Sequence, residues 1–187
     1  QVVEIGIVEG RNHIVKRIKK LHMKKVNFKK HPVNLKGALP QTGMPAPSFS
    51  LVKTDLATIS LEDFKGKTLV LNIFPSLDTG VCATSVRKFN QLASNMKDTL
   101  VLAISRDLPF AHSRFCTVEG IENVIPLSDF RGTSFSEDYG VMMTDGPLQG
   151  LLARAVVIID PDQIVRYVQL VPEITQEPDY DEVLRHL

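Results

Sequence analysis

The chain has 187 residues, 43% of them hydrophobic, and a formal charge of +1 at neutral pH. A chain of this length can bury one sizeable core, and it favours one main domain with an appendage over two domains. No apolar stretch approaches the roughly 20 residues that span a bilayer, and the N-terminus lacks the apolar core of a secretory signal, so we expect a cytoplasmic protein that does not bind membranes. The two cysteines are too few for a disulfide scaffold, so the pair is either redox-active or simply buried.

Charge divides the N-terminal region from the rest. Residues 1–37 carry ten Lys and Arg against two Asp and Glu, whereas the other 150 residues carry twelve against nineteen. We expect residues 1–22 to be a foreign or appended basic segment and 23–187 to form the main domain, because Gln1 is not an initiator and Met23 reads as a natural start. Part of the segment, Gly10-Arg-Asn-His-Ile-Val-Lys-Arg17, is similar to a motif near the C-terminal end of a pseudouridine synthase family. The catalytic domain of that family is absent here, so we do not expect RNA contact through residues 1–22, although basic patches can bind phosphates.

The first part of the main domain predicts short elements. Weakly alternating apolar residues around His31-Pro32 indicate a small hairpin within Met23–Leu35. A loop rich in proline and glycine follows, up to Pro47. Phe49–Val52 then predicts a short strand, and Ile59–Phe64 a turn that leads to Gly66.

The stretch from Thr68 to Cys82 is the centre of the chain. Residues Thr68–Phe74 form an apolar run that predicts a strand buried on both faces, and Pro75 ends it. After a polar turn, apolar residues at three- and four-residue steps predict an amphipathic helix that begins near Gly80. Cys82 then lies in the first turn of that helix, where unpaired N–H groups and the helix dipole stabilise a thiolate. The alternative is an inert cysteine of the core.

Strands and helices alternate through the rest of the sequence. The predicted elements are the strand Leu100–Ser105, the short helix Phe110–Cys116, the strand Val124–Leu127, the helical turn Phe135–Tyr139, the strands Ala155–Ile159 and Ile164–Leu170, and a last helix opening at Pro178. This order predicts an α/β protein with a mixed central sheet that is flanked by helices.

The spacing Pro75-x-x-x-Thr79-x-x-Cys82 indicates a shielded pocket, in which proline bars solvent and the threonine hydroxyl bonds the sulfur or its substrate. Here the sequence resembles the peroxiredoxins, and the run Asn72–Asn90 is similar to their thiol peroxidase subfamily. The runs Asp107–Cys116, Gly150–Ala155 and Glu173–Tyr180 match as well. The resemblance covers nearly everything from Met23 to Leu187.

This resemblance implies a thioredoxin-like fold and an atypical two-cysteine peroxidase. Cys82 would attack hydrogen peroxide or an organic hydroperoxide, and Cys116, at the resolving position, would form an intramolecular disulfide with it. Arg154 corresponds to the catalytic arginine. The family also implies thioredoxin as reductant and a homodimer. No cofactor or metal is expected, because the sulfur itself performs the two-electron chemistry.

The residues alone leave alternatives open. Arg154 stands in an apolar run, where it needs an anionic partner, and a salt bridge to Asp or Glu would satisfy it without any catalytic role. Cys116 could be a buried structural cysteine. Cys82-Ala-Thr-Ser85 fits a thiol–disulfide exchange protein or a peroxide sensor.

Two other short patterns have simpler explanations. Asp78-Thr-Gly80 is the aspartic-protease tripeptide, but it occurs once and such an enzyme needs two carboxylates. His112-x-x-x-Cys116 has metal-ligand spacing, but it lacks the four ligands of a zinc site, and we expect His112 at the surface. We also expect the reduced protein to hold Cys82 and Cys116 apart, so that a disulfide forms only after local unfolding.

Overall fold

The computed structural model describes residues 24–132 and 134–187, so the expectations for residues 1–22 lie outside the described part of the chain. The strands are β1 (Lys25–Phe28), β2 (His31–Lys36), β3 (Ser50–Val52), β4 (Thr58–Ser60), β5 (Thr68–Ile73), β6 (Thr99–Ser105), β7 (Val124–Ser128), β8 (Met142–Met143), β9 (Ala155–Ile159) and β10 (Val165–Leu170). The helices are the 3₁₀ turn η1 (Leu61–Phe64), α1 (Gly80–Ala93), α2 (Pro109–Glu119), α3 (Phe135–Asp138) and α4 (Tyr180–Leu184).

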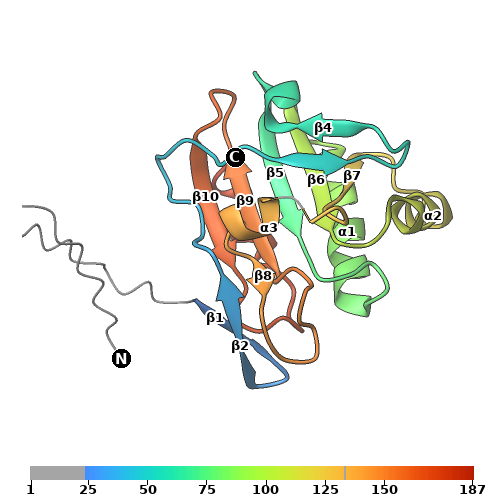
Figure 1. The fold of residues 1–187 in the computed structure, drawn as a ribbon. Coiled ribbons are helices and arrows are strands. Elements are labelled where there is room, and N and C mark those ends of the chain that lie inside the picture. Colours follow the sequence, from blue (N-terminus) through green and yellow to red (C-terminus); the bar gives the residue numbers. More distant parts are fainter. Residues whose placement is uncertain (1–23, 133) are drawn as a thin grey trace, which may run out of the picture.

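A seven-stranded mixed sheet in the order β10-β9-β5-β6-β7-β3-β4 forms the centre of the fold. Strand β5 pairs in parallel with β6, and β6 with β7, whereas β9 runs antiparallel to both β5 and β10. Figure 1 shows these strands side by side, with α2 beyond the β7 side of the sheet. The prediction of an α/β protein with a mixed central sheet is confirmed.

The central strands are buried on both faces, as the apolar run Thr68–Phe74 predicts. In β5, Leu69, Leu71 and Ile73 belong to one core cluster, and Val70 belongs to a second cluster on the opposite face. The second cluster includes Cys82, Val86 and Phe89 of α1, together with Val183 of α4. Helix α1 therefore packs its apolar face on the sheet and fixes the position of its first turn.

The predicted N-terminal hairpin is present as β1 and β2. It forms a separate small sheet with β8, a two-residue strand that the sequence does not predict. The two turn residues, Lys29 and Lys30, both have positive φ values, 51° and 70°. This left-handed geometry suits the twist of a two-residue hairpin turn but is costly for residues other than glycine and asparagine. The hairpin projects from one end of the main sheet (Figure 1).

Helix α2 is longer than the predicted Phe110–Cys116. Pro109 occupies its first turn, where the missing N–H costs nothing, and Gly120 ends it in the left-handed conformation with φ of 62°. The N–H groups of Gly120 and Ile121 both donate to the carbonyl oxygen of Cys116. Among the described residues no helix is long and apolar enough to cross a bilayer.

Candidate active site

Cys82 lies in the first turn of α1, as predicted, and its side chain is completely buried. The strand β5 leads to this point, and Pro75, also buried, follows it directly. The first N–H groups of a helix have no partner within the helix and carry partial positive charge. The sulfur is thus held at a place that favours an anion.

Thr79 is the N-cap residue of α1, but its hydroxyl does not cap the helix. Its Oγ1 lies 2.7 Å from Sγ of Cys82 and 3.0 Å from the carbonyl oxygen of Ser76. A hydroxyl has only one proton to donate, so it can donate to a Cys82 thiolate or, when it accepts a hydrogen bond from the thiol, to the carbonyl oxygen of Ser76. The side chain is therefore oriented to the sulfur in either protonation state.

Arg154 immediately precedes β9 and its side chain is 1% exposed. Its Nη2 lies 3.3 Å from Sγ of Cys82, although the two residues are 72 positions apart. Nε and Nη2 also donate to the carbonyl oxygen of Ile174, at 3.2 and 3.1 Å. In the described part of the chain no carboxylate lies within ion-pair distance of this guanidinium, so the salt-bridge alternative finds no partner there.

One donor of Arg154 is left over. Within the described residues Nη1 is buried and has no hydrogen-bond partner. Buried polar groups are nearly always paired, and an exception usually has a functional reason. With Nη2 beside the sulfur and Nη1 unpaired, this guanidinium is suited to bind an oxygen atom that approaches the sulfur.

The loop before α1 is held by Asp107, which the sequence analysis did not single out. Its carboxylate accepts from the N–H of Leu77 and the hydroxyl of Ser76, both at 2.8 Å, and from the hydroxyl of Ser105 at 2.8 Å. Asp107 follows β6, the parallel neighbour of β5. The carboxyl ends of adjacent parallel strands meet at one edge of a sheet. The position of Asp107 just after such a strand could therefore have indicated that it lies near the loop that follows β5.

His112 is buried, with 1% of its surface exposed, so the expectation of a surface histidine is wrong. Its Nε2 lies 3.0 Å from Oγ of Ser105, which links α2 to the Asp107 carboxylate. Burial lowers the pKa of His112 to about 4, against a smaller opposing effect of Asp107. The ring is neutral at physiological pH, and no cluster of metal-ligating residues exists among the described residues.

Cys116 lies in α2 and is half-buried, packed against the same apolar cluster that contains Cys82. Both thiols are free. Burial raises the pKa of the Cys116 thiol. While α2 is intact, Cys116 is therefore a poor nucleophile at neutral pH.

Asp78, the acid of the aspartic-protease tripeptide, is exposed and lies 3.4 Å from the guanidinium of Arg114. A single exposed carboxylate paired with arginine does not make a protease dyad. The structure brings together Thr79, Cys82 and Arg154, buries Pro75 before the loop that leads to α1, and places Cys116 on the neighbouring helix.

The sequence of the chain is similar to those of known proteins of one kind. Residues 41–184 match the family model described as Redoxin. The chain is 54% identical over 165 residues to a thiol peroxidase of Corynebacterium glutamicum and 53% identical over 165 residues to one of Mycobacterium tuberculosis. Each of these two matches covers 88% of this chain and 99% of the relative.

Solved structures agree with these matches. A peroxiredoxin-like protein from Aquifex aeolicus has a TM-score of 0.82 at 47% identity, over 88% of this chain and 96% of its own. A thiol peroxidase from Chromobacterium violaceum shares the fold, with a TM-score of 0.80 at 24% identity, over 86% of this chain and 93% of its own.

Proposed function

Because this chain belongs to the peroxiredoxin family, within its thiol peroxidases, we propose that it reduces hydrogen peroxide and organic hydroperoxides through Cys82 and Cys116. The thiolate of Cys82 attacks the terminal oxygen of the hydroperoxide. The O–O bond breaks, Cys82 becomes a sulfenic acid, and the leaving alkoxide or hydroxide takes up a proton to become an alcohol or water.

The observation that carries this proposal is the pair of donors on one buried sulfur, Oγ1 of Thr79 at 2.7 Å and Nη2 of Arg154 at 3.3 Å. Both stabilise a thiolate, and the unpaired Nη1 of Arg154 is available to the peroxide as negative charge develops on its leaving oxygen. Buried Pro75 keeps bulk water from the sulfur.

In the second step the Cys116 thiolate attacks Sγ of the sulfenic acid, the S–O bond breaks, and an intramolecular disulfide forms while the leaving hydroxide takes up a proton to become water. Because burial raises the pKa of Cys116, we infer that α2 first unfolds locally, which removes this effect of burial on the thiol and lets it reach Cys82. An external dithiol then reduces the disulfide. We propose thioredoxin for this role and a homodimer as the assembly, as the family resemblance implies, and the cytoplasm as the compartment.

Two serine variants test the proposal by hydroperoxide loss with thioredoxin and its reductase, together with intact mass and thiol counts. Cys82→Ser should lose more than 99% of turnover, because a serine hydroxyl stays protonated at neutral pH. Cys116→Ser should still consume one equivalent of peroxide and stop at the sulfenic acid. Substantial turnover by Cys82→Ser, or thioredoxin-dependent turnover at the wild-type rate by Cys116→Ser, would contradict the assignment.

The thiol–disulfide exchange alternative makes a different prediction in the same assay. Such a protein would oxidise slowly with peroxide and would react readily with model disulfides. The complete burial of Cys82 argues against it, because exchange requires a second disulfide to approach the sulfur in line.

A further inference from the structure

The carbonyl oxygen of Ile174 is the acceptor that fixes the Arg154 guanidinium, since it takes hydrogen bonds from both Nε and Nη2. A main-chain carbonyl can do this only if its own segment is held in place. Residues 171–175 follow β10 and belong to no helix or strand. The position of Arg154 therefore depends on whatever holds this segment.

The N-terminal hairpin holds it through the main chain. The N–H of Ile174 donates to the carbonyl of Asn27 at 2.8 Å, and the N–H of Asn27 donates to the carbonyl of Pro172 at 2.7 Å. These two bonds form a parallel bridge between β1 and Glu173. The hairpin is thus docked on the residue that contacts Arg154.

Glu173 adds a charged anchor at the same place. Its two carboxylate oxygens accept from the N–H groups of Lys29 and Lys30, each at 3.0 Å, and Oε1 also accepts from Oγ1 of Thr175 at 2.8 Å. These bonds lower the pKa of Glu173 to about 2, against the opposing effect of burial. The carboxylate also satisfies the N–H groups of a hairpin turn whose two residues both have positive φ.

We propose that Glu173 is a positioning residue for Arg154: by binding the Lys29–Lys30 turn it fixes the Ile174 carbonyl, and through it the guanidinium at Cys82. The inference rests on the proposed function, because it assumes that Arg154 stabilises the Cys82 thiolate. It gives the N-terminal hairpin a part in the chemistry, which the hairpin exerts through the main chain of residues 172–174.

Glu173→Gln tests the inference with little change of shape. The carboxamide presents an NH₂ group to one of the two N–H donors that the carboxylate binds, so one bond is lost and two donors face each other. We expect the midpoint of the pH dependence of Cys82 alkylation to rise by about half a unit and the rate constant with peroxide to fall roughly tenfold. Glu173→Asp keeps the charge and should recover part of both.

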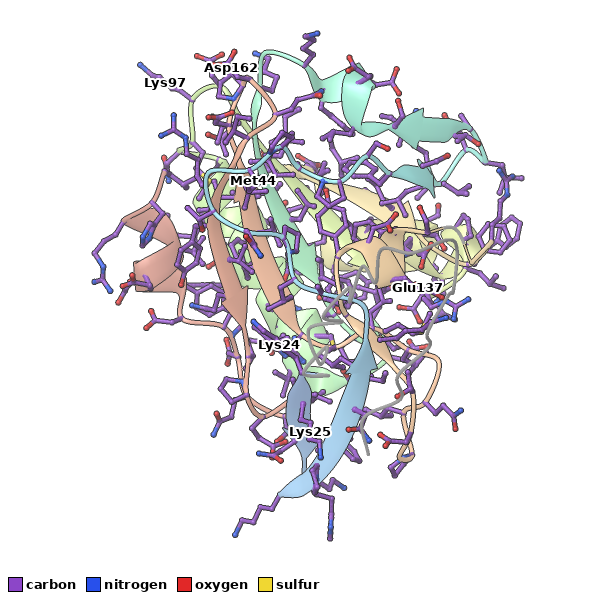
Figure 2. All side chains as sticks on the ribbon, turned by 60° about the vertical axis from the view of Figure 1, so that its left-hand side comes forward. Lys24, Lys25, Met44, Lys97, Glu137 and Asp162 are labelled. Carbon is purple, nitrogen blue, oxygen red and sulfur yellow. The ribbon has the colours of Figure 1, made fainter. Side chains whose placement is uncertain are left out.

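Glu137→Gln is the matched control. Glu137 forms an ion pair at 2.6 Å with Lys36, at the end of the hairpin farthest from the turn, so the variant also removes one charged contact between the hairpin and the body. Figure 2 shows Glu137 near that end of β2, well away from the turn. Both alkylation and peroxide rate should stay at the wild-type values.

A double variant separates the role of Glu173 from the role of Arg154. In the Arg154→Met background, Glu173→Gln should add no further change in alkylation midpoint or rate, because the group that it positions is gone. If Glu173→Gln lowers only the melting temperature, Glu173 is a structural anchor and the inference is overturned while the proposed function stands. If Arg154→Met itself changes neither readout, the role of Arg154 fails, and the inference falls with it. If Glu173→Gln does not fold, Glu173→Asp decides by the same readouts.

Discussion

The sulfur of Cys82 lies beside two hydrogen-bond donors. Thr79 offers a hydroxyl and Arg154 a full positive charge, both within hydrogen-bond distance. Donors that bind the charged form of a group favour that form, and a cation does so most strongly in a water-excluded site. The thiolate is therefore the state for which this pocket is built.

Replacing Arg154 with methionine keeps an unbranched apolar stem in the buried site and removes the charge. We expect peroxide reduction to slow by roughly 10²–10³, as for the loss of one stabilising donor, and Cys82 alkylation to need a higher pH. Stopped-flow kinetics and pH-dependent alkylation measure the two effects.

Arg166→Met serves as the control for that variant, because Arg166 lies on β10 and pairs with Asp160 through a side chain that is largely exposed. Wild-type rate and alkylation in Arg154→Met would reduce Arg154 to a packing role.

Helices α1 and α2 carry one cysteine each and are fastened together by their side chains. Arg87 of α1 makes a two-pronged ion pair with Glu119 of α2, at 2.7 and 2.8 Å. Beyond α2, Oδ1 of Asn90 accepts from the N–H groups of Glu122 and Asn123. In the proposed mechanism Cys116 reaches Cys82 when α2 opens, so these contacts would oppose the step that forms the disulfide.

Arg87→Met should speed disulfide formation. A partly exposed ion pair holds two elements together only weakly, so we expect α2 to open at most roughly fivefold faster. The rate is read from the loss of the sulfenic acid after one equivalent of peroxide. Hydrogen exchange should show faster exchange over residues 109–119 in the oxidised protein and, to a smaller extent, in the reduced variant.

Lys88→Met removes the same charge from the next, also exposed, residue and should leave the rate unchanged. An Arg87→Met protein that forms its disulfide at the wild-type rate would show that opening of α2 does not limit this step.

Sequence could predict the elements that carry strong local patterns. The run Thr68–Phe74 and the helix after Gly80 are defined by apolar spacing, and the first-turn position of Cys82 follows from them. The contact between Arg154 and the Ile174 carbonyl could not be predicted, because a main-chain acceptor has no side-chain signature and the two residues are 20 positions apart. His112 was misplaced because its burial depends on a hydrogen bond to Ser105.

At the scale of the whole molecule, the buried His112 makes stability depend on pH. Its pKa is lowered to about 4 in the folded protein, whereas an unfolded histidine has a pKa of about 6.5. Between these values the unfolded chain binds a proton that the folded chain does not, so stability is complete above pH 6.5 and falls toward pH 4.

We expect the free energy of unfolding to drop by roughly 3 kcal/mol over this range from His112 alone. Urea unfolding at several pH values measures it. His112→Gln should flatten the dependence, and His31→Gln, which alters an exposed histidine, should not. Equal slopes in wild type and His112→Gln would assign the loss to other groups. A separate decline below pH 4.5 should come from Glu173, whose pKa is lowered to about 2.

The basic N-terminal segment is predicted to be dispensable for catalysis. A protein that starts at Met23 should match the full chain in peroxide rate and melting temperature, because the hairpin and the site lie within residues 24–187. Limited proteolysis of the full chain should cut within residues 11–23 and leave an active body. A slower truncated enzyme would show that the segment takes part in the reaction.

The complete burial of Cys82 also sorts oxidants by size. The terminal OOH group of a hydroperoxide is small, so we expect it to reach the sulfur between Thr79 and Arg154 with only small movements of these side chains. Oxidised glutathione must bring a bulky S–S bond into line with the sulfur, which demands that the first turn of α1 open. On an open surface the same thiolate would exchange with many disulfides. Burial therefore disfavours the formation of mixed disulfides and favours the reaction with peroxide.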